Sequence, residues 1–281
     1  MQVYFLILYF FTYGFLGWCT EVAYATAKQK RFVNRGFLNG PVCPIYGVGV
    51  SVVIYFLTPV SGNFFFLYLS STVLVTVLEG LTGYFMDKIF HHKWWDYSNQ
   101  PLNIGGYVCL IFSLVWGVAC VAIVKVIHPV IHNVLAFLPV TAGIVLVSFL
   151  LIILFADLYV TASGILKFNR QLEMMDRIAQ ELKTLSDKLG ESIHENVMET
   201  MELNEESRRR LEERTAQQRE RIEGHLEEQR KRMAELKDRY EELLTQRPKV
   251  ARRLMSAFPG MESRHHKAVL EELKMKIKGR L

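Results

Sequence analysis

The chain has 281 residues, of which 51% are hydrophobic, and it carries a formal net charge of +5. Together with a positive mean hydropathy, this composition excludes an ordinary soluble domain of this size. The charges are unevenly placed: residues 1–166 hold 7 Lys and Arg and 5 Asp and Glu, whereas the remaining 115 residues hold 26 and 23. The sequence therefore predicts an apolar membrane half that is followed by a charged half.

Five apolar stretches in the first half approach the roughly 20 residues that a helix needs to cross a bilayer. We predict an all-α, polytopic membrane domain over residues 1–166, with spans at about 3–27, 41–59, 64–87, 106–127 and 134–160. The second stretch is the weakest, because Pro44, Gly47 and Gly49 occupy its first half. These residues favour a broken or partly re-entrant segment with irregular backbone beside a cavity.

The basic residues of the loops predict the orientation, since short cytoplasmic loops collect Lys and Arg. The loop after the first span holds four basic residues and the third loop holds Lys88 and Lys93, whereas the second loop holds none. We therefore expect a multi-pass plasma-membrane protein whose N-terminus lies outside and whose C-terminal tail lies in the cytoplasm.

Residues 167–247 are expected to be helical, because Lys167 to Gln246 includes two glycines and no proline. Mostly apolar residues recur there at the three-and-four spacing of a coiled-coil seam. The two runs are Met175, Ile178, Leu182, Leu185 and Leu189, and Ile222, Leu226, Gln229, Met233, Leu236, Tyr240 and Leu243. We expect a coiled-coil region that joins two chains into a homodimer. A single solvated helix with i,i+4 ion pairs, or a helix that folds back on itself, is the alternative.

Residues 248–281 form a third, basic segment, since 10 Lys and Arg stand against 3 Glu from Arg247 onward. An amphipathic helix is predicted to begin near Ser263, which can cap it. Its apolar stripe consists of Val269, Leu270, Leu273 and Ile277. This helix either contacts anionic lipid or an acidic partner, or packs on the rest of the chain. We expect no nucleic-acid binding, because the basic residues lack interleaved aromatic residues.

Two carboxylates within the predicted spans mark a candidate site, because ionisable residues in a bilayer usually face a protein interior, a cavity or each other. Glu21 lies 7 residues before Lys28 and Glu79 lies 9 residues before Lys88. At 1.5 Å per residue, both lie about 10–13 Å above the cytoplasmic ends of their spans. We predict a cytoplasm-facing polar pocket that consists of Glu21, Glu79, Asn39, Pro41, Pro44, Tyr46, Gly47, Asp96 and Asn103. The alternative is that these groups only satisfy one another between packed helices.

The outer half of the spans offers few polar groups by comparison, namely Lys125, His128 and His132, which we expect near the interface. A polar route for an ion through the whole bilayer is therefore not expected. A lipid or another apolar substrate needs no such route.

The sequence contains no recognisable motif of an enzyme or a metal site. His91 and His92 are consecutive, whereas zinc ligands are usually at least three residues apart. The HExxH, nucleophile-elbow and GxxxxGK[ST] patterns do not occur. We therefore expect no catalytic residue, no cofactor, no metal and no nucleotide-hydrolysing domain in this chain.

Long motifs occur in two stretches of the first half: GFLGWCTEVAYATAKQKRFVNRGFLNGPVCPIYGVG at 14–49 and LEGLTGYFMDKIFHHKWWDYSNQPLNIGGYVCLIFSLVWG at 78–117. They closely resemble the bacterial membrane proteins of the putative ABC-transporter type IV family, also named putative ABC transporter permeases. The resemblance covers roughly residues 1–165. It implies a multi-span plasma-membrane protein with a transport role and a separate ATPase subunit.

Three functions agree with these observations. The favoured one is a permease subunit that forms a homodimer through residues 167–247 and contacts membrane lipid. The alternative is a membrane-anchored scaffold or sensor whose coiled coil recruits cytoplasmic partners. The third, an intramembrane enzyme acting on lipid, would need His91, His92 or Glu21 as its acid or base.

Overall fold

The computed structural model describes residues 2–202, 205–246 and 248–278, and its regular structure is almost entirely helical. The chain divides into two compact units. The first, here called the membrane unit, consists of Met1–Phe168 and Pro248–Lys267. The second, the hairpin unit, consists of Asn169–Arg247 and Ala268–Leu281. This division differs from the three consecutive segments that the sequence suggests, because part of the C-terminal segment belongs to the membrane unit.

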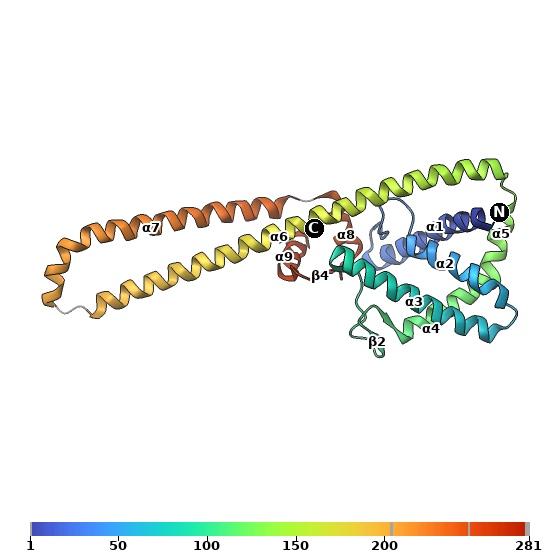
Figure 1. The fold of residues 1–281 in the computed structure, drawn as a ribbon, viewed down its shortest axis with the longest axis horizontal. Coiled ribbons are helices and arrows are strands. Elements are labelled where there is room, and N and C mark those ends of the chain that lie inside the picture. Colours follow the sequence, from blue (N-terminus) through green and yellow to red (C-terminus); the bar gives the residue numbers. More distant parts are fainter. Residues whose placement is uncertain (1, 203–204, 247, 279–281) are drawn as a thin grey trace. The chain divides into compact units, whose positions relative to one another are not determined.

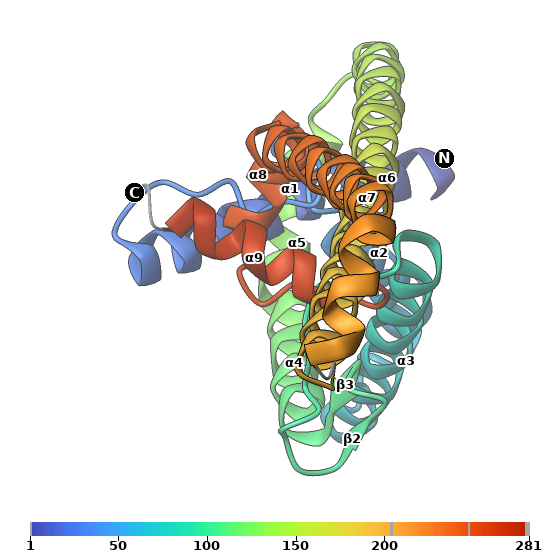
Figure 2. The same ribbon diagram turned by 90° about the vertical axis from the view of Figure 1, so that its left-hand side faces the viewer.

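The membrane unit is built on four helices that lie next to one another in chain order (Figures 1 and 2). They are α1 (Gln2–Gln29), α2 (Pro44–Leu57), α3 (Phe64–Phe90) and α4 (Leu110–Ala122), with a short 3-10 turn, η1 (Thr58–Val60), after α2. Within the described residues, four helical runs are long and apolar enough to cross a membrane: Gln2–Gln29, Phe64–Phe90, Leu110–Ala136 and Val140–Glu191. The first half of the chain is therefore a polytopic membrane domain, as predicted.

The stretch expected to be the second span is an apolar helix, but it is shorter than the others. Pro44 occupies its first turn, where a helix needs no backbone donor, so this proline starts α2 and does not break it. Gly47 leaves room for α1, because a Cβ there would lie 2.5 Å from the Phe10 carbonyl oxygen. The expected interruption within the helix is therefore wrong, and the irregular backbone lies before it, at 30–43. The count of five spans stays a prediction.

The helices in the region of the fourth and fifth predicted spans have boundaries that differ from the predicted ones. Strands β2 (Asn103–Ile104) and β3 (Val108–Cys109) form a small antiparallel hairpin where the fourth span was expected to begin. Beyond α4, a π-helical turn, η2 (Ile123–Ile127), leads directly into α5 (His128–Ala136). The predicted loop around His128 is thus helical. Helix α6 (Val140–Glu202) then runs for 63 residues, so the predicted boundary at 166 falls within a helix.

The segment 248–267, here called the C-terminal strap, belongs to the membrane unit. It contains α8 (Lys249–Ala257), which the sequence did not predict, and strand β4 (Glu262–Ser263). β4 pairs antiparallel with β1 (His92–Lys93), with Ser263 opposite His92. Ala257 is buried in a small core with Ala25 and Val33. Ser263 is consequently part of a strand, and the predicted helix, α9 (Lys267–Lys278), begins four residues later.

The hairpin unit consists mainly of the second part of α6 and of α7 (Glu205–Thr245), which returns beside it (Figure 1). Gln171 donates hydrogen bonds to the carbonyl oxygens of Leu243 at 2.6 Å and Gln246 at 2.9 Å. Farther along, Arg232 lies 2.5 Å from Glu181. Gln171 of α6 thus pairs with Leu243 of α7, and the later residue Glu181 pairs with the earlier residue Arg232. The two helices are therefore antiparallel.

Burial in the hairpin unit follows the predicted seams. Met175 and Ile178 are buried. The next seam residues are half-buried, and the residues that lie between them on each helix are exposed. The half-buried seam residues are Leu182, Leu185 and Leu189 on α6, and Leu226, Gln229, Met233, Leu236 and Tyr240 on α7. The side chain of Ile222 lies outside the described residues. The tail therefore folds back on itself, and the homodimer stays a prediction.

The apolar stripe of α9 also packs within the chain. Val269, Leu270 and Leu273 are buried, and the Tyr240 hydroxyl of α7 donates to a Glu272 carboxylate oxygen at 2.5 Å. The side chain of Ile277 lies outside the described residues. The apolar stripe therefore packs within the hairpin unit, whereas contact of the basic face with anionic lipid or an acidic partner stays a prediction.

Candidate functional site

Glu21 forms the first polar cluster of the membrane unit, two turns before the end of α1. The Tyr46 hydroxyl donates to Glu21 Oε1 at 2.6 Å, and Arg35 Nε lies 3.1 Å from Oε2. Tyr46 comes from the first turn of α2, and Arg35 comes from the irregular segment 30–43. Gly17 makes space for the tyrosine, because a Cβ there would lie 2.4 Å from Tyr46 Cγ. The Glu21 carboxylate is therefore both paired and hydrogen-bonded, which offsets its removal from water.

Glu79 forms the second cluster, on α3. The Tyr97 hydroxyl donates to Glu79 Oε1 at 3.3 Å. Glu79 Oε2 is buried, and the described part of the structure provides no hydrogen-bond partner for it. Burial raises the pKa of Tyr97, and the carboxylates of Glu79 and Glu21 raise it further. Tyr97 therefore stays protonated and acts as a hydrogen-bond donor to Glu79.

The segment 30–43 is held by hydrogen bonds to its neighbours. The Asn34 side-chain oxygen accepts from Trp18 Nε1 at 2.7 Å. The Asn39 side chain donates to Asp157 Oδ1 at 2.7 Å, and the Gly40 backbone N–H donates to Asp157 Oδ2 at 2.7 Å. Asn39 thus fastens the segment to α6, and the adjacent Pro41 is exposed. The structure does not bring either of these predicted pocket residues into contact with the two carboxylate clusters.

Asp96 and Asn103 fold the loop between α3 and α4. Asp96 Oδ1 accepts from the Ser98 backbone N–H at 3.0 Å, and Asn103 donates to the Gln100 carbonyl at 2.8 Å. Gly106 has a φ of +76°, and a Cβ there would lie 2.5 Å from Asp96 Oδ1. The two predicted site residues therefore shape the loop that carries Tyr97 and do not contact Glu79 themselves.

The C-terminal strap contributes two arginines that sequence reasoning missed. Arg253 donates to the carbonyl oxygens of Gly36 at 2.6 Å and Phe37 at 2.7 Å. Arg264 forms a two-pronged ion pair with Asp87 at the end of α3, and this contact raises the pKa of Arg264. These partners are separated by 177 to 217 positions in sequence, so no local pattern indicates them.

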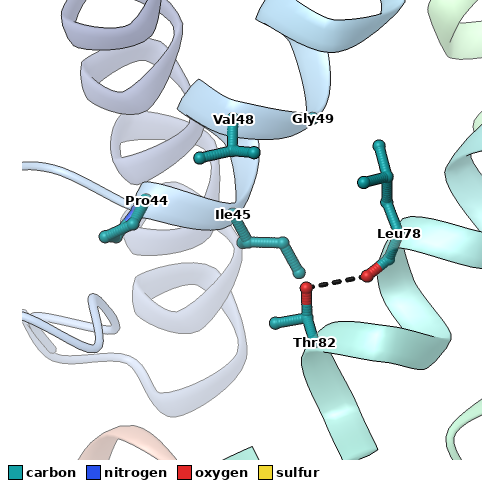
Figure 3. A pocket seen from close by; sticks show the side chains of 6 residues that line it. All are labelled: Pro44, Ile45, Val48, Gly49, Leu78 and Thr82. Carbon is teal, nitrogen blue, oxygen red and sulfur yellow. Dashed lines mark hydrogen bonds between the residues drawn. The ribbon is translucent and has the colours of Figure 1, made fainter. Parts of the chain in front are cut away.

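A hollow of about 190 Å³ lies between α2 and α3 (Figure 3). Its lining is mainly apolar and consists of Pro44, Ile45, Val48, Gly49, Leu78 and Thr82. The Thr82 hydroxyl donates to the Leu78 carbonyl at 2.7 Å, so its hydrogen-bonding capacity is largely used within α3. Of the predicted pocket residues, Pro44 lines this hollow, whereas Glu21, Tyr46 and Glu79 lie in the two carboxylate clusters. An alkyl group suits such a lining better than an ion does.

Comparison with known proteins agrees with the resemblance seen in the sequence. A family model described as putative ABC-transporter type IV matches residues 8–162. This range contains Glu21, Glu79 and the loop that carries Tyr97, and it ends before the hairpin unit and the strap. Comparison with curated proteins and with solved structures gives no match. The family model matches more than half of the residues of this chain, so the chain belongs to the putative ABC-transporter type IV family.

Proposed function

We propose that the chain is a permease subunit of an ABC-type transporter in the plasma membrane. In this proposal α2 is a fifth span, the N-terminus lies outside, and the hairpin unit lies in the cytoplasm. The family membership and the basic loops support it. The sequence has no phosphate-binding GxxxxGK[ST] motif, so ATP hydrolysis is assigned to a separate subunit.

The Glu79 carboxylate, whose Oε2 atom is buried, is the observation that carries this proposal. One of its oxygens lacks a hydrogen-bond partner among the described residues, in a helix that is apolar enough to cross a membrane. A polar group left unpaired in an apolar medium is costly, so such groups in membrane helices usually bind a ligand, an ion or a proton. The nearby Glu21 is already paired with Arg35, which leaves Glu79 as the group with capacity to spare.

The apolar hollow supports a lipid or another apolar molecule as the substrate class. It is lined by α2 and α3, and Leu78 on its wall directly precedes Glu79. A substrate with an alkyl portion for the hollow and a hydrogen-bond donor for Glu79 would use both features. Five spans per chain are few for a complete pathway, so the proposal includes at least a dimer, formed through residues 167–247.

The test is purification of the full-length chain from its native membranes after crosslinking, followed by reconstitution in phospholipid nanodiscs. We expect an ATPase subunit to copurify with the wild-type chain and with Glu79→Gln. We expect Glu79→Gln to lower ATP hydrolysis by the complex about tenfold, which corresponds to about 1.4 kcal/mol. Glu262→Gln in the strap is the matched control and should leave the rate unchanged. The absence of any ATPase from the wild-type sample would contradict the permease proposal.

A membrane-anchored scaffold or sensor is the second candidate function. The specific observation in its favour is that the family match ends at residue 162, before the long hairpin unit begins. A scaffold predicts that soluble cytoplasmic proteins crosslink to the chain and are lost when the hairpin is deleted. It also predicts that Glu21→Gln and Glu79→Gln leave the cellular function intact, which is the opposite of the permease expectation.

A further inference from the structure

Two tyrosines of α1 form hydrogen-bonded pairs with two histidines of α5. The Tyr9 hydroxyl lies 2.6 Å from His132 Nδ1, and the Tyr13 hydroxyl lies 3.2 Å from His128 Nδ1. Both tyrosines are buried, His128 is half-buried and His132 is exposed. We call these four residues the Tyr–His ladder. The N-terminal half of α1 thus contains more polar groups beside α5 than the sequence suggested. The reason is that Tyr9 and Tyr13 form hydrogen bonds with the two histidines that were expected near the interface.

The local backbone explains why both histidines face α1. His128 and His132 are four residues apart, which places them on one side of α5. The π-helical turn η2 directly precedes them and shifts the helical phase, and such turns often occur at functional sites. The tyrosines are likewise four residues apart on α1, and they pack with Val50 and Ile54 of α2. The ladder is therefore a polar array built on rigid helices.

The hydrogen bonds are compatible with a tautomer in which Nε2 of each imidazole can accept a ligand. Each Nδ1 is bonded to a tyrosine hydroxyl, so a neutral ring whose proton is on Nδ1 donates it to the tyrosine oxygen. Its Nε2 lone pair is then directed elsewhere. Histidines that ligate a metal typically donate their other ring N–H to an oxygen acceptor, most often a carboxylate, a backbone carbonyl or water, which fixes the tautomer and the ring orientation. The tyrosines have this supporting arrangement.

We propose that His128 and His132 bind a divalent transition-metal cation through Nε2. Paired histidines at i and i+4 on a helix are a known arrangement for zinc, and imidazole suits Zn²⁺, Ni²⁺ and Cu²⁺. The ring centroids lie 6.0 Å apart, and one ion binds both rings when they rotate so that each Nε2 lies about 2 Å from it.

The site has two protein ligands, so bound water completes the coordination. The described residues contain no group of three or more His, Cys, Asp and Glu that could hold a metal ion. The charged residue nearest in the helical run is Lys125, which lies three residues before His128 and has an exposed side chain. A site with two imidazoles and open positions differs from a structural zinc site, which has four protein ligands, and we expect it to exchange its ion readily.

The place of the ladder on α1 connects it to the carboxylate cluster. Tyr9, Tyr13, Gly17 and Glu21 recur at intervals of four, and Gly17 contacts Tyr46, the partner of Glu21. Tyr13 and Glu21 are eight residues apart, or about 12 Å along the helix. The binding of a metal at the ladder does not rest on the proposed permease function.

The test uses the full-length chain without a histidine tag, in phospholipid nanodiscs, titrated with Zn²⁺ in equilibrium dialysis. We expect one saturable site, weakened about tenfold or more in His128→Gln and in His132→Gln. Tyr9→Phe should weaken it less, because it removes a supporting hydrogen bond and keeps both ligands. His225→Gln removes an exposed histidine of α7 and is the matched control, which should bind as the wild type does.

His132→Cys keeps a zinc ligand and should retain saturable binding, which separates loss of a ligand from loss of the fold. Unchanged Zn²⁺ binding in a His128→Gln, His132→Gln double variant would overturn the proposal, and so would loss of the site in His225→Gln. Failure of the permease proposal has a different signature, since the wild-type chain would then bind Zn²⁺ and copurify with no ATPase.

Discussion

The ion pair between Arg264 and Asp87 should hold the C-terminal strap on the membrane unit. The Asp87 side chain is 7% exposed and receives both prongs of the guanidinium. The backbone N–H of residue 264 also donates to the His91 carbonyl at 3.0 Å, next to the paired strands β1 and β4. Replacing Arg264 with Gln leaves the backbone hydrogen bond in place but removes the charge that compensates Asp87.

The cost of this replacement follows from what remains around Asp87. Removing one partner of a fully buried ion pair costs about 3–5 kcal/mol. The Arg264 side chain is 45% exposed, so solvent already screens the pair, and the Tyr107 hydroxyl still donates to Asp87 at 2.6 Å. We therefore expect about 2 kcal/mol, toward the weaker values of exposed pairs. At 1.4 kcal/mol per factor of ten, the population of open strap rises about 30-fold.

Hydrogen exchange of the full-length protein in detergent micelles measures this population directly. In Arg264→Gln the amide of residue 264 should exchange about 30-fold faster, while amides in the middle of α3 keep their rates. Arg252→Gln is the control, because Arg252 is an exposed arginine of the same strap. An increase below about threefold at residue 264, or an equal increase in the control, would refute the role assigned to the pair.

Three further changes test other parts of the structure. Gly47→Ala should lower the free energy of unfolding by about 1–3 kcal/mol, because its Cβ would meet the α1 backbone, whereas Gly49→Ala on the same helix has open space; thermal unfolding in detergent compares the two. Met175→Ala should destabilise the hairpin unit by about 2–5 kcal/mol and the exposed neighbour Met174→Ala by much less, as measured by helical circular dichroism on heating. Burial raises the pKa of Asp96, but hydrogen bonds from its neighbours lower it more, so its folded pKa lies below the ordinary value. The ionised Asp96 carboxylate therefore contributes fully to loop stability above its unfolded pKa of about 3.9, and this contribution is lost as pH falls through the folded pKa. Asp96→Asn should remove this pH dependence of loop stability, which tryptophan fluorescence measures.

The sequence predicted the apolar helices well because their signals are local. Helix α3 begins at Phe64 as expected, directly after Asn63, whose side chain accepts hydrogen bonds from the Phe65 and Phe66 backbone N–H groups. The contact between Glu21 and Tyr46 was also within reach, since both residues were assigned to one site. Long apolar runs and caps depend on neighbours within a few residues, so composition and spacing suffice to find them.

Features that depend on distant segments were not predictable in the same way. The strap was expected to be a separate basic segment, yet Arg253 donates to carbonyl groups near the start of the chain. A backbone carbonyl accepts from any donor that reaches it, so the sequence around Gly36 and Phe37 contains no sign of its partner. The π-helical turn was likewise invisible, and without it His128 had no predicted relation to Tyr13.

The antiparallel hairpin bears on how two chains can associate. Its two helices are joined within one chain, so each seam is presented to the other at a high effective concentration, in the millimolar range for short connections. A second chain offering the same seam competes with this internal partner and must also displace the hydrogen bonds of Gln171. A homodimer through residues 167–247 therefore requires either exchange of α7 between two chains or contacts between the charged outer faces. Exchange preserves the seam and both Gln171 bonds, whereas outer-face contacts rest on exposed charges and weaken as salt screens them. Dimerisation that persists in concentrated salt would thus indicate exchanged helices.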